Sequence, residues 1–245
     1  MLTIQNLHKA YQTHTVLDQV SLELPQGQVL AVLGRSGCGK TTLLKALAGL
    51  LTLDAGSINW AGESMDAVPS REREMVYLFQ EPLLFPHLSV FENLAYGLRV
   101  RKEAEAQVQQ KVVQMLQELE LQEHAQKKPS HLSGGQRQRV AFGRAIIFLP
   151  RVLLLDEPFA SLDAQSRASM QRLFLRLARK YNITALFVTH EVKEALLVGD
   201  RFAYMAAGKL QVYTSKDAFI ADPQTGVRDE LAFWSALEQQ TTYQP

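Results

Sequence analysis

The stretch GRSGCGKTT, residues 34–42, constrains the fold of this chain more than any other feature of the sequence. It matches the pattern G-x-x-x-x-G-K-[ST], follows the apolar run QVLAVL and precedes the helix-like LLKALAGL. A glycine-rich loop between a buried strand and a helix directs backbone N–H groups and the positive end of the helix dipole at one point. The pattern and its surroundings agree, so they predict a phosphate-binding loop rather than a chance glycine-rich turn.

Residues of three kinds are expected to bind the phosphates of a nucleotide in this loop. The glycines let backbone N–H groups wrap the phosphates, Lys40 supplies a positive charge, and Thr41 offers its hydroxyl to Mg²⁺. Cys38 is interpreted as a small filler, since nothing near it in sequence resembles a Cys–His pair. The expected nucleotide-binding residues of the loop are Gly34, Arg35, Ser36, Gly37, Cys38, Gly39, Lys40, Thr41 and Thr42.

The remaining pattern predicts an α/β fold. LTIQNLHKAY and TVLDQVSLEL read as two strands joined by a turn, and SINW and EMVYLF read as further strands. Later the apolar strands RVLLLD and ITALFVTH flank the helix-like AQSRASMQRLFLRLARK, and RFAYMAAGKLQVYT reads as a hairpin. Fully apolar strands that alternate with helices indicate a parallel sheet covered on both faces.

The character of the chain changes between its strand-rich parts. From about residue 87 to 149 it is helical, with EAEAQVQQKVVQMLQELEL and VAFGRAIIF as the clearest helices. We therefore expect one domain over 1–214 that carries this helical insertion, followed by a short helical tail over 215–245. In the tail, one helix face is expected to dock on its own domain or, alternatively, to form a partner surface. That face comprises Val227, Leu231, Trp234 and Leu237.

Two apolar strands are each followed by polar side chains that suit phosphate chemistry. Asp156 and Glu157 end RVLLLDE, and His190 ends ITALFVTH. Ligands bind at the carboxyl ends of strands in open parallel sheets. There, one acid can hold Mg²⁺ through water, the next can position or deprotonate an attacking water, and the histidine can contact a γ-phosphate. A charged strand end or a helix cap is the alternative interpretation, which the phosphate loop makes the weaker one.

The octet LSGGQRQR, residues 132–139, places a serine and two glycines before a second helix. It reads either as a plain helix cap with Ser133 as N-cap or as a second phosphate site made of N–H groups and a hydroxyl. Because it lies in the helical insertion, it is not expected to reach the nucleotide of its own phosphate loop. A second copy arranged head to tail could bring it there, so that a symmetric dimer buries two nucleotides.

Composition narrows the classes of function. The 245 residues are 47% hydrophobic and carry a formal net charge of +1, which does not suggest nucleic acid as a partner. One cysteine excludes an intramolecular disulfide and fits a reducing compartment. The N-terminus does not resemble a signal peptide, and no apolar run approaches the roughly 18 residues of a membrane span. We expect a cytoplasmic protein that reaches a membrane only through a partner.

Taken in order, these motifs resemble the nucleotide-binding subunit of ABC transporters, from about Leu2 to Thr214. GRSGCGKTT is similar to Walker A, LSGGQ to the signature sequence, and LLLDEP to Walker B. The resemblance implies a P-loop NTPase fold of the ABC type, with a RecA-like core, an antiparallel β subdomain and an inserted α-helical subdomain. It also implies that the chain is an ATPase with two competent sites per homodimer, because no catalytic position is substituted.

The resemblance further implies roles for single residues. Tyr11 would stack on adenine, and Gln80 in LFQEP would be the Q-loop residue. Mg²⁺ would be held by Thr41 and Gln80, with Asp156 in its outer shell. Glu157 would polarise the attacking water, while His190, Gln80 and Lys40 complete the catalytic set. The other chain of the dimer would contribute Ser133, Gly135 and Gln136. Gly134 and, in the D-loop Ser161–Asp163, Asp163 would be further nucleotide-binding residues.

QEPLLFPHLSVFENLAYGLR and DEPFASLDAQSR are most similar to importer subunits for iron, polyamines, sulfate, molybdate and thiamine. That similarity implies integral membrane permease subunits as partners, a substrate-binding protein as an indirect one, and a peripheral place on the cytoplasmic side of the inner membrane. The apolar stretch Leu83–Pro86 would contact a permease helix or, alternatively, pack within the helical lobe. Several of these relatives carry a C-terminal regulatory barrel that we do not expect here.

Three other functions compete with an import motor. A soluble ABC ATPase acting on DNA or ribosomes usually has a coiled-coil insertion or two fused cassettes, neither of which the sequence contains. An exporter subunit is the stronger alternative, although such cassettes are often fused to membrane spans. A P-loop kinase or another RecA-like ATPase would not explain LSGGQ. The transported solute is not encoded in this chain, since permease and binding protein set specificity.

Overall fold

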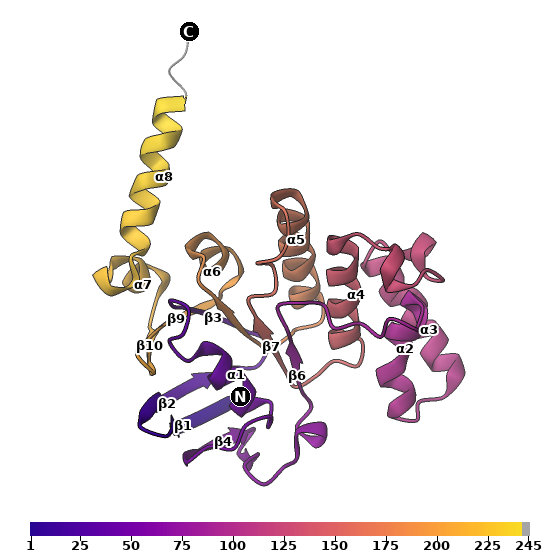
Figure 1. The fold of residues 1–245 in the computed structure, drawn as a ribbon, viewed down its shortest axis with the longest axis horizontal. Coiled ribbons are helices and arrows are strands. Elements are labelled where there is room, and N and C mark those ends of the chain that lie inside the picture. The colour runs from indigo at the N-terminus through magenta and orange to yellow at the C-terminus, as the bar shows by residue number, and fades with distance from the viewer. Residues whose placement is uncertain (242–245) are drawn as a thin grey trace.

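Two sheets organise the molecule, which is described by a computed structural model for residues 1–241 (Figure 1). The larger sheet has six strands in the order β10-β9-β3-β8-β7-β6. Its strands β9, β3, β8, β7 and β6 run parallel, and β10 pairs antiparallel with β9 at the edge. The bounds are β3 Val29–Leu33, β6 Met75–Leu78, β7 Val152–Asp156, β8 Ala185–Thr189, β9 Arg201–Ala206 and β10 Lys209–Tyr213.

The smaller sheet is antiparallel and has the order β2-β1-β4-β5. Its strands are β1 Leu2–Tyr11, β2 His14–Leu24, β4 Ala55–Trp60 and β5 Glu63–Ser64. Helix α1 (Lys40–Leu47) lies between the two sheets, because its buried leucines belong to one apolar cluster with both of them. That burial fixes the start of α1, and with it the phosphate loop, at the carboxyl end of β3.

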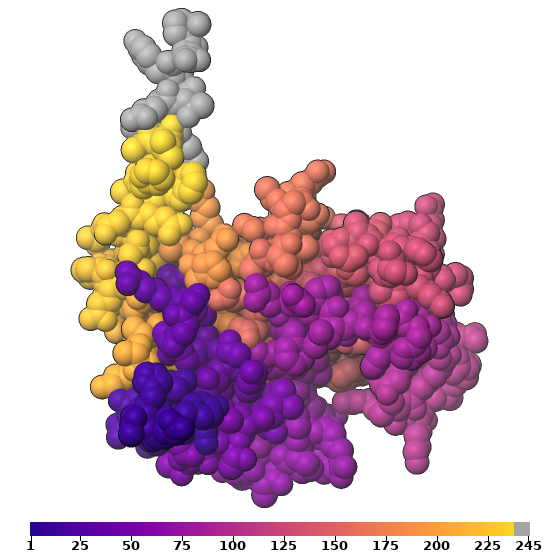
Figure 2. All heavy atoms as spheres, in the orientation of Figure 1, coloured from indigo at the N-terminus to yellow at the C-terminus, as the bar shows by residue number. Residues whose placement is uncertain are grey.

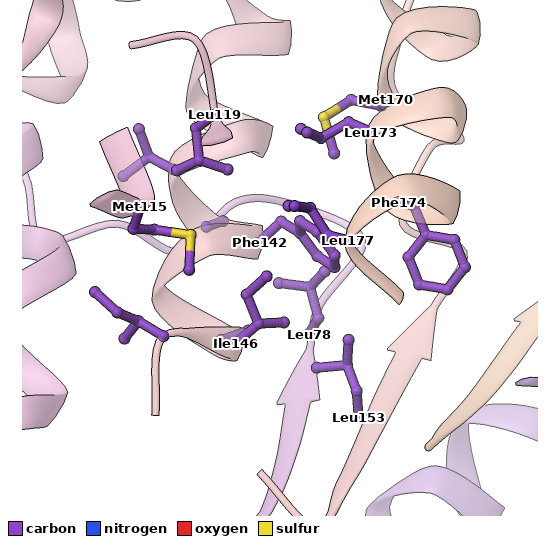
Figure 3. Close-up of a cluster of buried hydrophobic side chains, with 14 of the residues drawn as sticks. Leu78, Met115, Leu119, Phe142, Ile146, Leu153, Met170, Leu173, Phe174 and Leu177 are labelled. Carbon is purple, nitrogen blue, oxygen red and sulfur yellow. The ribbon is translucent and has the colours of Figure 1, made fainter. Parts of the chain in front are cut away.

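The helical lobe enters the chain between β6 and β7. It contains α2 (Val90–Val100), α3 (Glu105–Glu118) and α4 (Gly134–Ile146). Figure 3 shows that its core continues onto the larger sheet: Phe142 of α4 lies beside α5 (Ala164–Lys180) and above Leu78 and Leu153 of the sheet. The rings of Phe142 and Phe174 are 5.8 Å apart. This shared core positions the octet at the start of α4 relative to the sheet.

The chain after β10 is helical. It forms α7 (Lys216–Ala221) and α8 (Val227–Thr241), and α6 (Val192–Val198) precedes β9. Val227 is fully buried and Leu231 packs against the same apolar cluster. Farther along, α8 extends away from the body (Figures 1 and 2). The predicted docking of this helix on its own domain therefore holds for its first turns, while Trp234 is partly exposed beneath the Lys193 ammonium, 3.5 Å from the ring centre.

The remaining short elements are 3₁₀ turns. They are η1 Ser70–Glu72, η2 Gln122–His124, η3 Pro129–His131 and η4 Pro223–Thr225. Sequence analysis predicted the long strands and helices, and the structure confirms them. It did not predict β5, α6 or α7, which have two, seven and six residues and are too short to establish a period. Within residues 1–241 no helix combines the length and apolar character needed to cross a bilayer.

Candidate nucleotide site

The phosphate loop borders a cavity of about 290 Å³ at the carboxyl ends of the parallel strands. Glycines and Lys40–Thr42 form one wall, and Gln80, Asp156 and Glu157 form the opposite one. The sequence had predicted these residues to converge, although 115 positions separate Thr41 from Asp156. The cavity is lined by Val16, Ser36, Gly37, Gly39, Lys40, Thr41, Thr42, Gln80, Asp156 and Glu157.

Close packing against β9 requires glycine in the loop. A Cβ atom at Gly34 would lie 2.4 Å from the Met205 carbonyl oxygen and 2.9 Å from the Cys38 sulfur. Gly39 has φ of 112°, and a Cβ there would lie 2.5 Å from the Val16 carbonyl oxygen. Cys38 is partly buried and packs as a small side chain, as expected. The loop can therefore approach its neighbours only with a bare backbone.

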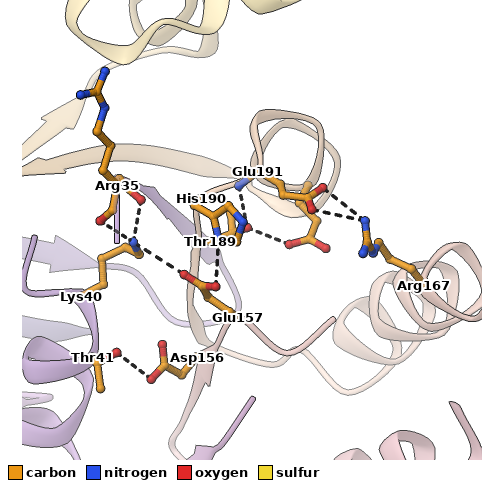
Figure 4. A network of polar contacts seen from close by, with 11 residues as sticks. Arg35, Lys40, Thr41, Asp156, Glu157, Arg167, Thr189, His190 and Glu191 are labelled. Atoms are coloured by element: carbon orange, nitrogen blue, oxygen red, sulfur yellow. Dashed lines mark hydrogen bonds and ion pairs between the residues drawn. The ribbon is translucent and has the colours of Figure 1, made fainter. Parts of the chain in front are cut away.

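Lys40 is held at the centre of the site (Figure 4). Its side chain is 5% exposed, and its ammonium donates to the carbonyls of Gly34 at 2.6 Å and Arg35 at 3.0 Å. It also lies 3.8 Å from Glu157 Oε1, and the other oxygen of Glu157 lies 2.9 Å from His190 Nδ1. The three side chains predicted to surround a γ-phosphate thus form one continuous polar chain, with Glu157 between the two nitrogens.

Thr41 and Asp156 form the predicted Mg²⁺ position. The Thr41 hydroxyl donates to Asp156 Oδ2 at 2.9 Å, and the Tyr77 hydroxyl donates to the same oxygen at 2.5 Å. Burial and this carboxylate raise the pKa of Tyr77. Gln80 lines the same cavity. Oxygen donors from one hydroxyl, one carboxylate and one amide fit Mg²⁺, which keeps waters and phosphate oxygens as its other ligands.

The octet forms a separate half-site. Ser133 caps α4: its hydroxyl oxygen accepts from the Gln136 N–H at 3.2 Å, and Gln136 Oε1 accepts from the Ser133 N–H at 2.9 Å. The expectation of a helix cap is confirmed, but of the Ser133 hydroxyl the cap uses only an acceptor position. Its hydroxyl proton and the N–H groups of Gly134 and Gly135 are not used in the cap, and a Cβ at Gly134 would meet open space.

A cavity of about 300 Å³ lies beside this cap, and none of its lining residues lines the phosphate-loop cavity. Its walls are α4, α5 and the turn after α3. Gln136 was predicted to bind the nucleotide, but both ends of its side-chain amide already have partners within the chain. Its nitrogen lies 2.8 Å from His124 Nε2, and its oxygen accepts from the Ser133 N–H. One chain thus presents two incomplete half-sites. The second cavity is lined by Glu120, Leu121, Ser133, Gly135, Gln136, Arg139, Gln165, Ser166, Ser169 and Met170.

Other predicted residues lie around these half-sites. Tyr11 is 50% exposed at the tip of β1, with the Lys9 ammonium 5.5 Å from its ring, and it does not line the phosphate-loop cavity. Asp163 is the N-cap of α5, and hydrogen bonds from Ser166 lower its pKa. Arg35 and Ser36 line a further cavity of about 550 Å³ between the phosphate loop, His190 and the start of α8.

The stretch Leu83–Pro86 was predicted either to contact a permease helix or to pack within the helical lobe, and its four side chains differ in exposure. Leu83 and Pro86 are exposed, while Leu84 and Phe85 are half-buried against the helical lobe. Buried Asn93 fixes the backbone: it accepts from the Phe85 N–H and donates to the carbonyls of Phe85, Leu88 and Ser89. A rigid loop therefore presents two of the four side chains to solvent.

Sequence analysis missed several residues that support the site. Tyr77 binds Asp156, and buried Gln138 donates to the Pro158 carbonyl at 2.6 Å. Arg167 contacts Glu191 beside His190. Each is a polar residue within a strand or helix. Its hydrogen-bond partner is distant in sequence, so the partner could be identified only from the structure.

The fold and the paired half-sites define a P-loop nucleotide-binding protein with an antiparallel sheet and a helical lobe. The family model described as ABC transporter matches residues 17–160, and the chain belongs to this family.

Two relatives are named as import ATP-binding proteins. The sulfate/thiosulfate import ATP-binding protein CysA of Bordetella parapertussis is 45% identical over 214 residues, 86% of this chain and 60% of that protein. The spermidine/putrescine import ATP-binding protein PotA of Haemophilus influenzae is 40% identical over 223 residues, 91% of this chain and 60% of that protein. The chain thus spans about 60% of the length of these relatives.

A solved structure shares the fold. It is the dimeric, post-hydrolysis state of the ATP-binding cassette MJ0796 bound to ADP and Pi. It is 27% identical, has a TM-score of 0.76, and the match covers 86% of this chain and 97% of that one. The predicted P-loop fold of the ABC type is confirmed.

Proposed function

We propose that this chain is the ATP-binding and ATP-hydrolysing subunit of an importer, and that it works as a head-to-tail dimer with two ATP molecules between the copies. The observation that carries the proposal is the separation of the two half-sites into different cavities of one chain. The phosphate-loop cavity lacks the Ser133 hydroxyl and the glycine N–H groups, and the cavity beside Ser133 lacks the phosphate loop. A two-fold axis that brings one cavity to the other completes both sites at once. That the MJ0796 cassette is a dimer bound to ADP and Pi supports this arrangement.

In the proposed mechanism, residues 34–42 bind the ATP phosphates and Tyr11 stacks on adenine. The γ-phosphate enters where Lys40 now approaches Glu157, and it replaces the carboxylate as the nearest anion to the ammonium. Ser133, Gly134 and Gly135 of the other copy donate to the same phosphate through a hydroxyl and N–H groups. The partner's α4 dipole adds to this attraction, so ATP holds the two copies together.

Hydrolysis in the closed dimer follows from the position of Glu157. Its carboxylate accepts a proton from the attacking water, while the water oxygen bonds to the γ-phosphorus and the bond to the ADP oxygen breaks. His190 holds the γ-phosphate and orients Glu157 through the 2.9 Å contact. Mg²⁺, bound by Thr41 and Gln80 with Asp156 in the outer shell, would offset the charge on the phosphate oxygens.

Coupling to transport requires a membrane partner. The exposed Leu83 and Pro86, on the loop that Asn93 holds rigid, form the proposed contact for a permease helix. Permease subunits would hold the dimer at the cytoplasmic face of the membrane, and a substrate-binding protein would deliver the solute to them. The importer relatives for sulfate/thiosulfate and spermidine/putrescine support a small solute as cargo.

Co-purification from detergent-solubilised membranes of the native cell, with ATP present, tests the import role. Tagged Glu157→Gln protein is the bait, and Glu157→Gln with Leu83→Glu is its matched control. The proposal predicts recovery of a polytopic permease with the first protein and several-fold less with the second. Recovery of only ribosomal or DNA-bound proteins would contradict it.

A further inference from the structure

Arg167 is adjacent to both half-sites of the chain. It lies in the first turn of α5, where its neighbours Gln165 and Ser166 line the cavity beside Ser133. Its guanidinium points the other way, toward the loop that carries His190 (Figure 4).

Two sets of hydrogen bonds define this connection. Arg167 Nη1 donates to the Glu191 carboxylate at 3.3 and 3.5 Å, and Nη2 donates to the Leu162 carbonyl at 3.1 Å. Glu191 directly follows His190, and Leu162 lies in the loop between Glu157 and α5. A planar guanidinium fixes the relative position of two acceptors better than a flexible ammonium can. Arg167 therefore sets the distance between these two loops.

The His190 loop is held further by a buried hydrogen-bond network. Thr189 donates to Glu194 at 2.8 Å and accepts from the Glu191 N–H at 3.0 Å. Gln171, one turn after Arg167 on α5, donates to Glu194 at 3.3 Å. Helix α5 thus contacts the side chains of Glu191 and Glu194, and Glu194 in turn accepts from Thr189, so both neighbours of His190 are linked to α5. A displacement of α5 will be transmitted to the imidazole because buried polar networks tolerate few alternative arrangements.

We infer that Arg167 is a positioning residue that couples the two nucleotides of the dimer, by linking the half-site at Ser133 to the catalytic half-site at Glu157 and His190. The inference rests on the proposed function, because the two half-sites of one chain then serve different ATP molecules. A partner phosphate bound beside Ser133 and α5 would fix α5, and Arg167 would hold the His190 loop in the hydrolytic position. Occupation of one site would thereby promote hydrolysis at the other.

Steady-state ATP hydrolysis by Arg167→Gln, Glu191→Gln and the double variant tests this coupling. Each single change is expected to lower kcat about tenfold, as loss of an orienting outer contact does, and to change KM for ATP less than twofold. The kcat of the double variant should be no lower than that of the less active single variant, because both changes break the contact between Arg167 and Glu191. Arg172→Gln, on the exposed side of α5, is the matched control and should retain normal kcat.

A kcat for Arg167→Gln within twofold of the wild-type value would overturn the inference, as would multiplicative losses in the double variant. Thermal melting of each variant separates this effect from unfolding. Arg167→Lys keeps the charge without the planar fork and should recover only part of kcat.

Amide hydrogen exchange of the nucleotide-free protein distinguishes failure of the inference from failure of the proposed function. Arg167→Gln is expected to raise exchange in the loop 158–163 and in 189–192 together. A rise in one loop alone, or in neither, would contradict the coupling even if the wild-type protein hydrolyses ATP. If the wild-type protein hydrolyses no ATP but both loops respond, the proposed function fails while the physical link stands.

Discussion

At the scale of single residues, the site places one carboxylate between two nitrogen-bearing side chains. Glu157 contacts Lys40 on one side and His190 on the other, and the Lys40 ammonium is further held by two loop carbonyls. A γ-phosphate at this position would contact the nearly buried Lys40 ammonium, whose side chain is already oriented toward it. Lys40 therefore contributes both attraction for the phosphate and order in the loop before the phosphate arrives.

Lys40→Ala is expected to weaken ATP binding itself. A charge-assisted hydrogen bond contributes about 1.5–3 kcal/mol, which corresponds to a loss of about 10–100-fold in affinity. Fluorescence titration with ATP measures this loss. Lys45→Ala, an exposed change on the same helix, is the control and should bind normally. Unchanged affinity in Lys40→Ala would show that Lys40 is not at the phosphates.

Glu194 gives a prediction about pH and stability. Burial raises its pKa above the ordinary value of 4.5, and Glu191 adds to the rise. Hydrogen bonds from Thr189 and Gln171, with the charge of Arg167, act in the opposite direction. The folded state therefore binds this proton more tightly than the unfolded state. Its contribution to the free energy of unfolding is largest below about pH 4.5 and is lost as pH rises toward the raised pKa.

Glu194→Gln removes this titration but keeps a side chain that can accept one hydrogen bond. The free energy of unfolding of the variant, relative to the wild-type protein, should rise as pH increases above 4.5 and stay constant below that value. Urea denaturation across this pH range measures the difference. Parallel pH curves for the two proteins would contradict the predicted effect of burial on Glu194.

At the scale of elements, the start of α4 can serve two purposes with different atoms of the same residues. The cap between Ser133 and Gln136 stabilises the helix within one chain. The free hydroxyl proton and the glycine N–H groups can still bind a phosphate from another chain. The sequence left these two interpretations open as alternatives, and the cap geometry makes them compatible.

Substitutions at Ser133 separate the two purposes. Ser133→Asn keeps a good N-cap, whereas Ser133→Ala should cost about 1 kcal/mol of folding free energy. Ser133→Arg places a long side chain over the phosphate position. Its monomer should bind ATP as the wild-type protein does, but hydrolysis should fall more than tenfold because the dimer cannot close. Normal turnover by Ser133→Arg would mean that the octet is only a helix cap.

Long elements were predictable because their periodicity is local. The buried strands β3, β7 and β8 read as unbroken apolar runs, and α5 was predicted with the bounds that the structure shows. Short elements such as α6 follow from tertiary contacts and carry no period of their own. The extension of α8 away from the body could not be predicted either. The spacing of its apolar residues indicates a helix face, but it does not indicate how many turns of that face pack on the domain.

At the scale of the whole molecule, the two sheets and the shared core determine where the two half-sites lie in the chain. The convergence of residues 34–42, Asp156, Glu157 and His190 was predictable from strand ends in a parallel sheet. The links through Tyr77, Gln138 and Arg167 were not, because a polar residue in an amphipathic pattern does not identify its distant partner. Sequence thus predicts which groups meet at the site better than it predicts how those groups are held.

Light scattering of Glu157→Gln with saturating Mg²⁺-free ATP shows whether ATP binds between two copies of the chain. The variant should bind ATP without hydrolysing it, so the closed dimer should accumulate. With ATP we expect a mass twice the 27.5 kDa of the chain, and the monomer mass when Ser133→Arg is added. A mass of 27.5 kDa for Glu157→Gln at saturating ATP would contradict the shared site.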